Sequence, residues 1–262
     1  MVAKDYAAIA AKYISRPADS KRRPNILVYG RNKKGKTTFS ISAGIENTLV
    51  IDPEDGTDEM KVKNPHRWKI SRWEELDDVY NYLRYSSHPY TWVSVDGLTR
   101  ISNMSLKYVM KLQEEKTLDR TPNMVQLKDY GKANELMKDL LNRFHTLPLG
   151  VVFTAQERQA SGGDSEEDDE ITETPSIYIA DLPKGVRGAV NALVDVIGRI
   201  YVVGGQGDEG DKAERRLWIG DSVKYDTGFR SDYNLPDMIK DPTIPKLVRL
   251  MRTGSETPTR RK

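Results

Sequence analysis

The segment that most constrains this chain is a loop rich in glycine and lysine at residues 30–37. Its sequence, GRNKKGKT, matches the pattern G-x-x-x-x-G-K-[ST]. The apolar run 26–29 leads directly into this loop, and the helix-compatible run 38–43 leaves it. A strand, such a loop and a helix in this order form a P-loop, whose backbone N–H groups surround phosphate oxygens. The sequence therefore predicts an α/β protein with a site for a nucleotide phosphate.

The residue types within the loop fit this chemistry. Glycine permits the backbone conformations that turn successive N–H groups inward. Lys36 is placed to neutralise the β- and γ-phosphates, and the Thr37 hydroxyl to bind Mg²⁺. The alternative, a lysine-rich surface turn, leaves the strand before the loop and the helix after it unexplained. The residues predicted to bind the nucleotide are Gly30, Arg31, Asn32, Lys33, Lys34, Gly35, Lys36, Thr37 and Thr38.

An aspartate provides the second element of this site. Asp96 ends the β-branched run 91–95, which is where a P-loop protein holds Mg²⁺ through a water molecule. Taken alone, an aspartate followed by Gly97 is more typical of a turn or a helix cap. With the P-loop present, we predict that Thr37 and Asp96 together hold the metal.

Strand-like and helix-like segments alternate along the chain. We expect strands at 25–29, 48–51, 91–95, 149–154 and 196–203, and helices with apolar stripes over 76–83, 101–112 and 133–144. This order is typical of a mostly parallel sheet covered by helices. The glycine-rich segment 204–211 predicts a hairpin between 196–203 and 216–219. We divide the chain into an N-terminal helix and linker (1–23), a core (24–240) and a basic tail (241–262).

The composition excludes several classes of protein. The chain of 262 residues has no cysteine, hence no disulfide, thiolate nucleophile or zinc finger, and its three histidines are scattered. Its mean hydropathy is −0.64, and no apolar run approaches the roughly 18 residues that span a bilayer. The N-terminus lacks the apolar run of a secretion signal. We therefore expect a cytoplasmic protein with no membrane partner.

The charges are segregated although the net charge is only +2. Residues 157–173 hold eight acids and one base, so the remaining chain, with 40 basic and 31 acidic residues, carries +9. That remainder is suited to attract a polyanion, although mixed charge also simply keeps a protein soluble. The acidic, glycine-containing stretch 161–174 is expected to be a mobile loop.

Two short segments indicate a type of ATPase. The sequence DPEDG at 52–56 follows one expected strand, and AQE at 155–157 follows another. This resembles the RecA-type ATPases, in which a glutamate after a strand orients the attacking water and a strand-terminal glutamine contacts the γ-phosphate. The resemblance implies that Glu54 is the catalytic carboxylate and Gln156 the γ-phosphate sensor, acting with Lys36. Without it, Glu54 reads as a solvated turn acid and Gln156 as an amide bonded to backbone.

Within that group, the chain is similar to short RecA-like proteins of bacteriophages, described as AAA-domain or single-strand annealing proteins. The similarity rests on segments 29–38, 50–56, 129–131, 151–157, 181–203 and 224–236. It implies a RecA-like P-loop core with a C-terminal β-hairpin, and ATP and Mg²⁺ as cofactors. It further implies a DNA-stimulated ATPase that binds single-stranded DNA and promotes annealing or strand exchange in phage recombination. A phage or host single-strand binding protein is the expected partner, in the host cytoplasm.

The resemblance also implies a homo-oligomer, a ring or a filament, with ATP between subunits. Lys224 and Arg230 are the residues that match cations reaching a neighbour's γ-phosphate; otherwise they are ordinary surface cations. The apolar positions of the N-terminal segment, Tyr6, Ile9, Ala10 and Tyr13, predict a helix that docks either on an adjacent subunit or on its own domain.

The same resemblance places DNA contacts on two loops. Arg120 and Lys128 belong to the first, and Arg158, Lys184 and Arg187 to the second. The acidic block 164–170 lies within the second loop, where it repels DNA phosphates. We interpret the block as an electrostatic gate, whose neutralisation tightens DNA binding; recruitment of a basic partner and a ligand other than DNA are the alternatives.

A P-loop specifies phosphate binding and not the use of the energy. Three other functions therefore stay open: a small-molecule or nucleoside kinase, a helicase or packaging motor domain, and an ATP-gated DNA-binding scaffold that does not hydrolyse ATP.

Overall fold

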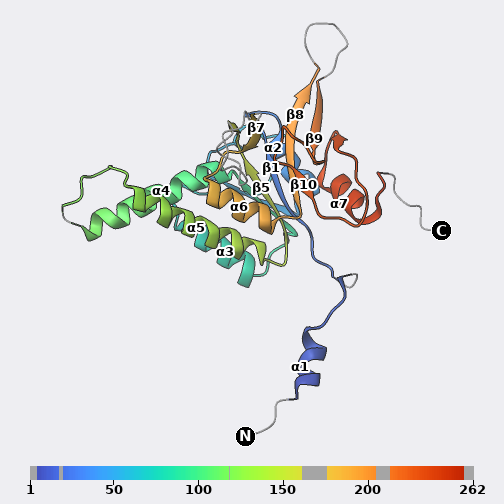
Figure 1. Ribbon diagram of the computed structural model, residues 1–262, viewed down its shortest axis with the longest axis horizontal. Helices are drawn as coiled ribbons and strands as arrows, with labels where there is room; N and C mark the ends of the chain where they lie inside the picture. Colours follow the sequence, from blue (N-terminus) through green and yellow to red (C-terminus); the bar gives the residue numbers. More distant parts are fainter. Residues whose placement is uncertain (1–4, 18–19, 118, 161–175, 205–212, 257–262) are drawn as a thin grey trace.

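The computed structural model describes residues 5–17, 20–117, 119–160, 176–204 and 213–256 (Figure 1). Its centre is a nine-stranded sheet in the order β11-β9-β8-β1-β5-β4-β2-β3, with β10 beside β8. All neighbours from β8 to β3 are parallel, whereas β9, β10 and β11 pair antiparallel. The strands are β1 Asn25–Tyr29, β2 Thr48–Asp52, β3 Arg67–Lys69, β4 Trp92–Asp96, β5 Gly150–Ala155, β8 Val196–Val203, β9 Glu214–Trp218, β10 Gly228–Phe229 and β11 Met238–Lys240.

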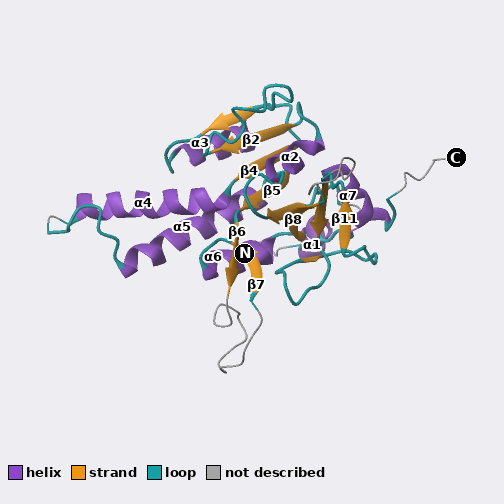
Figure 2. Cartoon of the chain, turned by 90° about the horizontal axis from the view of Figure 1, so that it is seen from above, coloured by secondary structure: helices purple, strands orange, loops and turns teal. Residues whose placement is uncertain are grey.

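Helices cover both faces of this sheet (Figures 1 and 2). Every residue of β1, β2 and β5 is buried, as expected for parallel strands covered on both sides. Successive β1 side chains point to opposite faces, so Leu27 and Tyr29 enter one apolar cluster while Ile26 and Val28 enter the other. The helices are α2 Lys36–Ser40, its 3₁₀ extension η2 Ile41–Ala43, α3 Glu75–Tyr85, α4 Leu98–Lys116, α5 Leu127–His145, α6 Lys184–Leu193 and α7 Ile244–Thr253.

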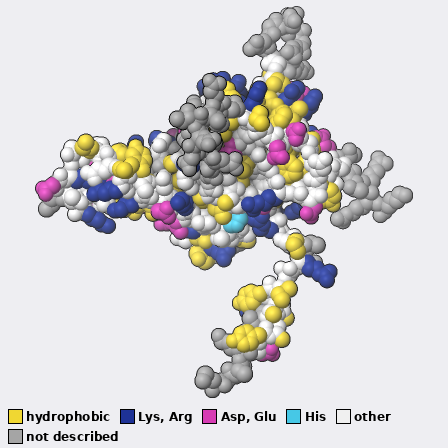
Figure 3. Space-filling view, in the orientation of Figure 1, with side chains coloured by type: hydrophobic (Ala, Val, Ile, Leu, Met, Phe, Trp, Pro, Cys, Tyr) yellow, Lys and Arg dark blue, Asp and Glu magenta, His cyan; other side chains and the backbone are white. Residues whose placement is uncertain are grey.

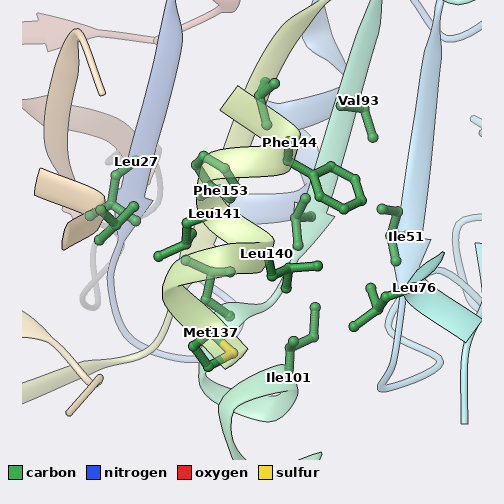
Figure 4. Packing of buried hydrophobic residues seen from close by; sticks show 14 of the residues in the cluster. Leu27, Ile51, Leu76, Val93, Ile101, Met137, Leu140, Leu141, Phe144 and Phe153 are labelled. Atoms are coloured by element: carbon green, nitrogen blue, oxygen red, sulfur yellow. The ribbon is translucent and has the colours of Figure 1, made fainter. Parts of the chain in front are cut away.

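The larger cluster lies under α3, α4, α5 and α6. Figure 4 shows Leu140 and Phe144 of α5 facing the sheet side chains, with Leu76 of α3 and Ile101 of α4 beside them. The apolar stripes of the three expected helices are these buried faces, and they make the sheet a rigid support for the loops at its ends. The distal ends of α4 and α5 project beyond the sheet as an arm (Figures 1 and 2).

The smaller apolar cluster includes α7, so the predicted boundary between core and tail at residue 240 is wrong. Residues 241–253 are not a tail: α7 follows an N-cap by Thr243 and buries Ile244, Leu247 and Leu250 against the sheet. The spacing of these three residues is helical, which is the signal in the sequence for this element. Residues 257–262, the end of the expected tail, lie outside the described part of the chain.

Other elements follow the expectation with small differences. The predicted hairpin is present as the antiparallel pair β8 and β9, although 205–212 between them lie outside the described residues. A second, two-stranded sheet of β6 Glu157–Ala160 and β7 Ile177–Ala180 stands where a long loop was expected. In α1, Tyr6–Tyr13, the two terminal tyrosines are 72% and 74% exposed, and the helix stands apart from the sheet in Figure 1. Docking of α1 on its own domain is therefore not found.

Candidate nucleotide-binding site

The loop of residues 30–35 follows β1 at the carboxyl edge of the parallel strands and leads into α2. Lys33 and Gly35 adopt left-handed backbone conformations, with φ of 61° and 99°. Gly30 is buried, and a Cβ there would lie 2.4 Å from the carbonyl oxygen of Ile200. The two glycines therefore allow the chain to turn tightly against the sheet, as the motif requires. Strand, loop and helix occur in the order predicted from the sequence.

Lys36 lies inside this loop and is buried. Its Nζ donates hydrogen bonds to the carbonyl oxygens of Gly30 at 2.8 Å and Arg31 at 3.0 Å, and to Oε1 of Gln156 at 2.9 Å. Burial lowers the pKa of Lys36, and the carboxylates of Asp96, Glu54 and Glu157 oppose this by favouring the charged form. All three bonding partners are neutral oxygens, so an anionic phosphate is a stronger partner for this ammonium group.

Gln156 lies beside the lysine of the loop, and its predicted role as γ-phosphate sensor stays a prediction. It is the first residue after β5, whose parallel pairing with β1 brings residue 156 beside the loop. Its backbone N–H donates to the Thr99 hydroxyl at 3.1 Å, which ties the end of β5 to the first turn of α4. The structure thus brings Lys36 and Gln156 together across 120 residues of sequence.

Thr37 and Asp96 also meet. The Thr37 hydroxyl donates to Oδ2 of Asp96 at 2.5 Å, and the Thr154 hydroxyl donates to Oδ1. Burial raises the pKa of Asp96, while the two hydroxyls and Lys36 oppose the shift. A hydroxyl and a carboxylate oxygen at the phosphate end of the loop form a donor set that suits Mg²⁺, which keeps several waters and also uses phosphate oxygens. Among the described residues, no group of three or more His, Asp or Glu side chains could hold a metal ion.

Glu54 lies on an ordered turn at the same edge. The buried carboxylate of Asp52 accepts hydrogen bonds from the backbone N–H groups of Glu54, Gly56 and Thr57 and from the Thr57 hydroxyl. This turn leaves the Glu54 side chain exposed, yet near enough for its charge to raise the pKa of Lys36. The position fits the predicted role in orienting water but does not test it.

One group of residues at this edge was missed by the sequence analysis. Glu157, next to Gln156, receives hydrogen bonds from Arg199 at 2.8 and 3.2 Å. The Arg199 guanidinium lies 4.6 Å from the ring centroids of both Tyr178 and Tyr225. An arginine within an apolar strand was the only signal in the sequence, because its partner lies 42 residues away.

Arg215 of β9 was also missed. Its Nε donates to the carbonyl oxygen of Lys34 at 3.2 Å, and a Cβ at Gly35 would meet this atom at 2.2 Å. Beside it, a cavity of about 480 Å³ begins at Thr38, the last predicted nucleotide ligand, and extends to Asp241. The nucleotide loop therefore has a wall supplied by the C-terminal part of the sheet.

The two cations predicted to act on a neighbouring subunit lie at different places. Both side chains are exposed. The carbonyl oxygen of Lys224 accepts from the N–H of Tyr178, on the side of the sheet that carries Gln156. Arg230 lies near Asp195, at the start of β8 and therefore at the opposite edge.

The predicted DNA ligands divide into exposed and buried side chains. The side chains of Lys128 and Lys184 are exposed. Nε of Arg158 lies 3.7 Å from Oδ1 of Asp181. Arg120 does not fit the predicted role, because its side chain is 1% exposed and bound to Asp129 at 2.5 Å. Arg187 is 6% exposed and lies 3.9 Å from Asp226, so it also does not present its charge to solvent. The acidic stretch 161–174 lies outside the described residues.

The fold and the site define a P-loop nucleotide-binding protein with a mostly parallel central sheet flanked by helices. Residues 22–231 match the family described as "AAA domain", and the chain belongs to this family. Among solved structures, a KaiC-like protein from the hyperthermophilic archaeon Pyrococcus horikoshii matches with 10% identity and a TM-score of 0.41, over 84% of this chain and 89% of that one. No curated protein matches the sequence. No helix in the described part of the chain has the length and apolarity to cross a membrane.

Proposed function

We propose that the protein binds ATP with Mg²⁺ at this site and hydrolyses it. The observation that carries the proposal is the pair of contacts at the carboxyl edge, Lys36 with Gln156 and Thr37 with Asp96. These contacts join the loop to the ends of β5 and β4, so the groups that would bind phosphate and metal are already held in position. Membership in a family of P-loop ATPases supports the same function.

Each residue has a distinct role in this proposal. Lys36 binds the β- and γ-phosphates, and Thr37 and Asp96 hold Mg²⁺ directly or through water. The metal supplies neutralisation of the charge that develops on the phosphate oxygens. Gln156 exchanges its bond with Lys36 for one with the γ-phosphate, and Glu54 orients the attacking water. Phosphoryl transfer to water depends mainly on such positioning.

The cavity beside Thr38 is the proposed place for the base and ribose. Its volume of about 480 Å³ falls within the usual range for small-molecule sites, about 300–1,000 Å³. Arg215 lies between this cavity and the phosphate loop. Calorimetry with ATP and Mg²⁺ tests the site: binding is expected for the intact protein and for Lys61→Ala, a substitution of an exposed lysine, but not for Lys36→Ala. Equal heats for the two variants would refute the proposal.

Binding of single-stranded DNA is a second proposed function. It is favoured by exposed cations along α4 and α5, namely Arg100, Lys107, Lys111, Lys128 and Lys132. Figure 3 shows Lys and Arg side chains gathered on the arm. Anisotropy of a labelled oligonucleotide, together with ATPase and strand-annealing assays, tests it. DNA-stimulated hydrolysis with annealing supports the phage recombination function; hydrolysis without DNA binding favours a kinase, unwinding favours a motor, and DNA binding without hydrolysis favours a scaffold.

Assembly into a ring or filament, with Lys224 and Arg230 acting on a neighbour's ATP, is part of the same proposal. Specific ATPase activity should then rise with protein concentration, and this rise should be lost in Arg230→Ala. Unchanged activity of the variant at every concentration removes Arg230 from the site. A single-strand binding protein of phage or host remains the proposed partner.

A further inference from the structure

A second group of cations lies at the opposite, amino edge of the sheet. Arg22 precedes β1, Arg230 follows β10, and Arg252 lies in the last turn of α7. These three arginines line a hollow of about 170 Å³ together with Pro24, Asp195, Val248 and Met251. Figure 3 shows Lys and Arg side chains gathered where the N-terminal segment leaves the body of the protein.

Backbone oxygens hold two of these arginines in place. Nη2 of Arg230 donates to the carbonyl oxygen of Ala192 at 2.8 Å, and Nη2 of Arg252 donates to that of Arg22 at 3.2 Å. Carbonyl groups orient a guanidinium without cancelling its charge. Such contacts keep like charges together at the hollow, where Coulomb repulsion would otherwise separate them.

One carboxylate balances only part of this charge. Arg22 bonds both oxygens of Asp195, at 2.6 and 2.7 Å, and Asp195 is the one acidic residue among those that line the hollow. Asp195 Oδ2 also accepts the backbone N–H of Asn25 at 2.8 Å, so the start of β1 fixes this carboxylate in place. Three guanidinium groups and one carboxylate leave an excess of positive charge.

The positive charge of two of these arginines also affects the pKa of His145. Burial lowers the pKa of His145, and Arg22 and Arg230 lower it further while Asp195 opposes them. The arginines therefore act on the same small volume, as their shared hollow indicates.

From this geometry we propose that the hollow is a phosphate-binding site, at the opposite edge of the sheet from the nucleotide loop of the same chain and formed by Arg22, Arg230 and Arg252. Planar guanidinium groups bind phosphate through paired, charge-assisted hydrogen bonds. At about 170 Å³, the hollow is smaller than the roughly 300 Å³ at which small-molecule sites begin. It therefore suits a single phosphate group, either free phosphate or one phosphodiester of a single-stranded nucleic acid, and not a whole nucleotide.

The experiment titrates the full chain with inorganic phosphate while NMR follows the arginine Nε–H resonances, assigned by substitution. In the intact protein, the resonances of the three arginines should shift together. Arg252→Gln should weaken this binding about tenfold or more, since it removes a hydrogen bond to a charged group. Arg249→Gln is the matched control, because it removes the same charge from the same helix but Arg249 does not line the hollow.

Asp195→Asn should change the phosphate affinity in the opposite direction, because loss of the negative carboxylate should tighten phosphate binding. A short oligo-dT without terminal phosphates distinguishes the sources: displacement of free phosphate identifies a phosphodiester ligand, and no displacement identifies free phosphate. The proposal is overturned if Arg252→Gln and Arg249→Gln behave alike toward both ligands, or if the three arginine resonances do not respond. None of these readouts requires ATP binding at Lys36.

Discussion

The two edges of the central sheet hold their charges in different ways. At the carboxyl edge, each pair includes a bond between side chains: Lys36 bonds Gln156 in addition to two backbone oxygens, and Thr37 bonds Asp96. At the amino edge, Arg230 and Arg252 bond backbone oxygens, which no substitution of a partner side chain would remove. The first arrangement can exchange its partners when a ligand binds, whereas the second presents fixed charge. The comparison teaches that similar cations in one fold are suited to catalysis or to simple anion binding according to what holds them.

Substitution of Lys36 should have the largest effect. Lys36→Ala removes the ammonium group that all three oxygens at the loop orient, and we expect ATP hydrolysis to fall about 10²- to 10³-fold, as for loss of one transition-state donor. Steady-state phosphate release measures this effect, and Lys61→Ala should retain full activity. Retained hydrolysis in Lys36→Ala would place the reaction elsewhere.

Asp96→Asn should follow, with about a 100-fold loss of Mg²⁺-dependent turnover, because the amide is a poorer partner for the metal. A magnesium titration of the ATPase reaction should also move to higher concentration. Asp139→Asn, on the exposed face of α5, is the control. If both variants require the same magnesium concentration as the intact protein, Asp96 is a structural cap at the end of β4.

A smaller effect is expected from Arg199, which belongs to the carboxyl edge but not to the phosphate loop. Arg199→Met breaks the bonds with Glu157 and leaves this 5% exposed carboxylate with only the more distant Arg31, whose Nε lies 3.9 Å from Oε1, among the described cations paired with it. We expect the free energy of unfolding to fall by about 2 kcal/mol. Urea denaturation measures it. Arg216→Met, which removes a more exposed ion pair with Glu214, should cost about 0.5 kcal/mol; equal losses would contradict the difference in burial.

The smallest effect concerns the titration of His145 at the amino edge. Arg230→Ala removes a positive neighbour, so the pKa of His145, lowered by burial and by Arg22 and Arg230, should rise toward its ordinary value. NMR titration of the three histidines measures this change. An unchanged or lower pKa in the variant would show that the charge of Arg230 does not act on this hollow.

The same group gives a pH dependence of stability. Because the pKa of His145 is lower in the folded than in the unfolded chain, the unfolded state binds more protons below about pH 6.5. The stability from neutral His145 is therefore present above this pH and is lost as the pH falls toward the folded-state pKa. Denaturation at about pH 7.5 and about pH 5.5 should show a smaller loss in Arg230→Ala than in the intact protein.

The sequence predicted the parts of this molecule that depend on local pattern. The boundaries of β1 and β8 agree with the predicted segments, because apolar runs bounded by turn residues define buried strands. The order of strand, loop and helix at residues 25–40 also followed from the motif. The pairing of Thr37 with Asp96 could be inferred because parallel strands bring their carboxyl ends to one edge.

Contacts between distant residues could not be predicted. Arg215 and Lys34 meet across 181 residues, and nothing in either segment indicates the other. Arg120 shows a different limit, because its partner Asp129 is only nine residues away, yet a lone arginine in a polar loop reads as a solvent-exposed cation. In the fold, the Arg120 side chain is buried because it forms an ion pair with the buried carboxylate of Asp129 in the first turn of α5. By contrast, the period of the apolar residues in α7 was available in the sequence and was overlooked.

The contact of Arg215 with the phosphate loop has a consequence for any attempt to shorten the chain. Strands β9 and β11 and helix α7 supply Leu217, Ile239 and Leu247 to the cluster that covers Ile26 and Val28 of β1. A fragment that ends at residue 204 would expose the back of the strand leading into the loop, although it contains the entire motif. A fragment that folds on its own therefore needs the chain through α7, so a minimal expression fragment has to extend to about residue 254.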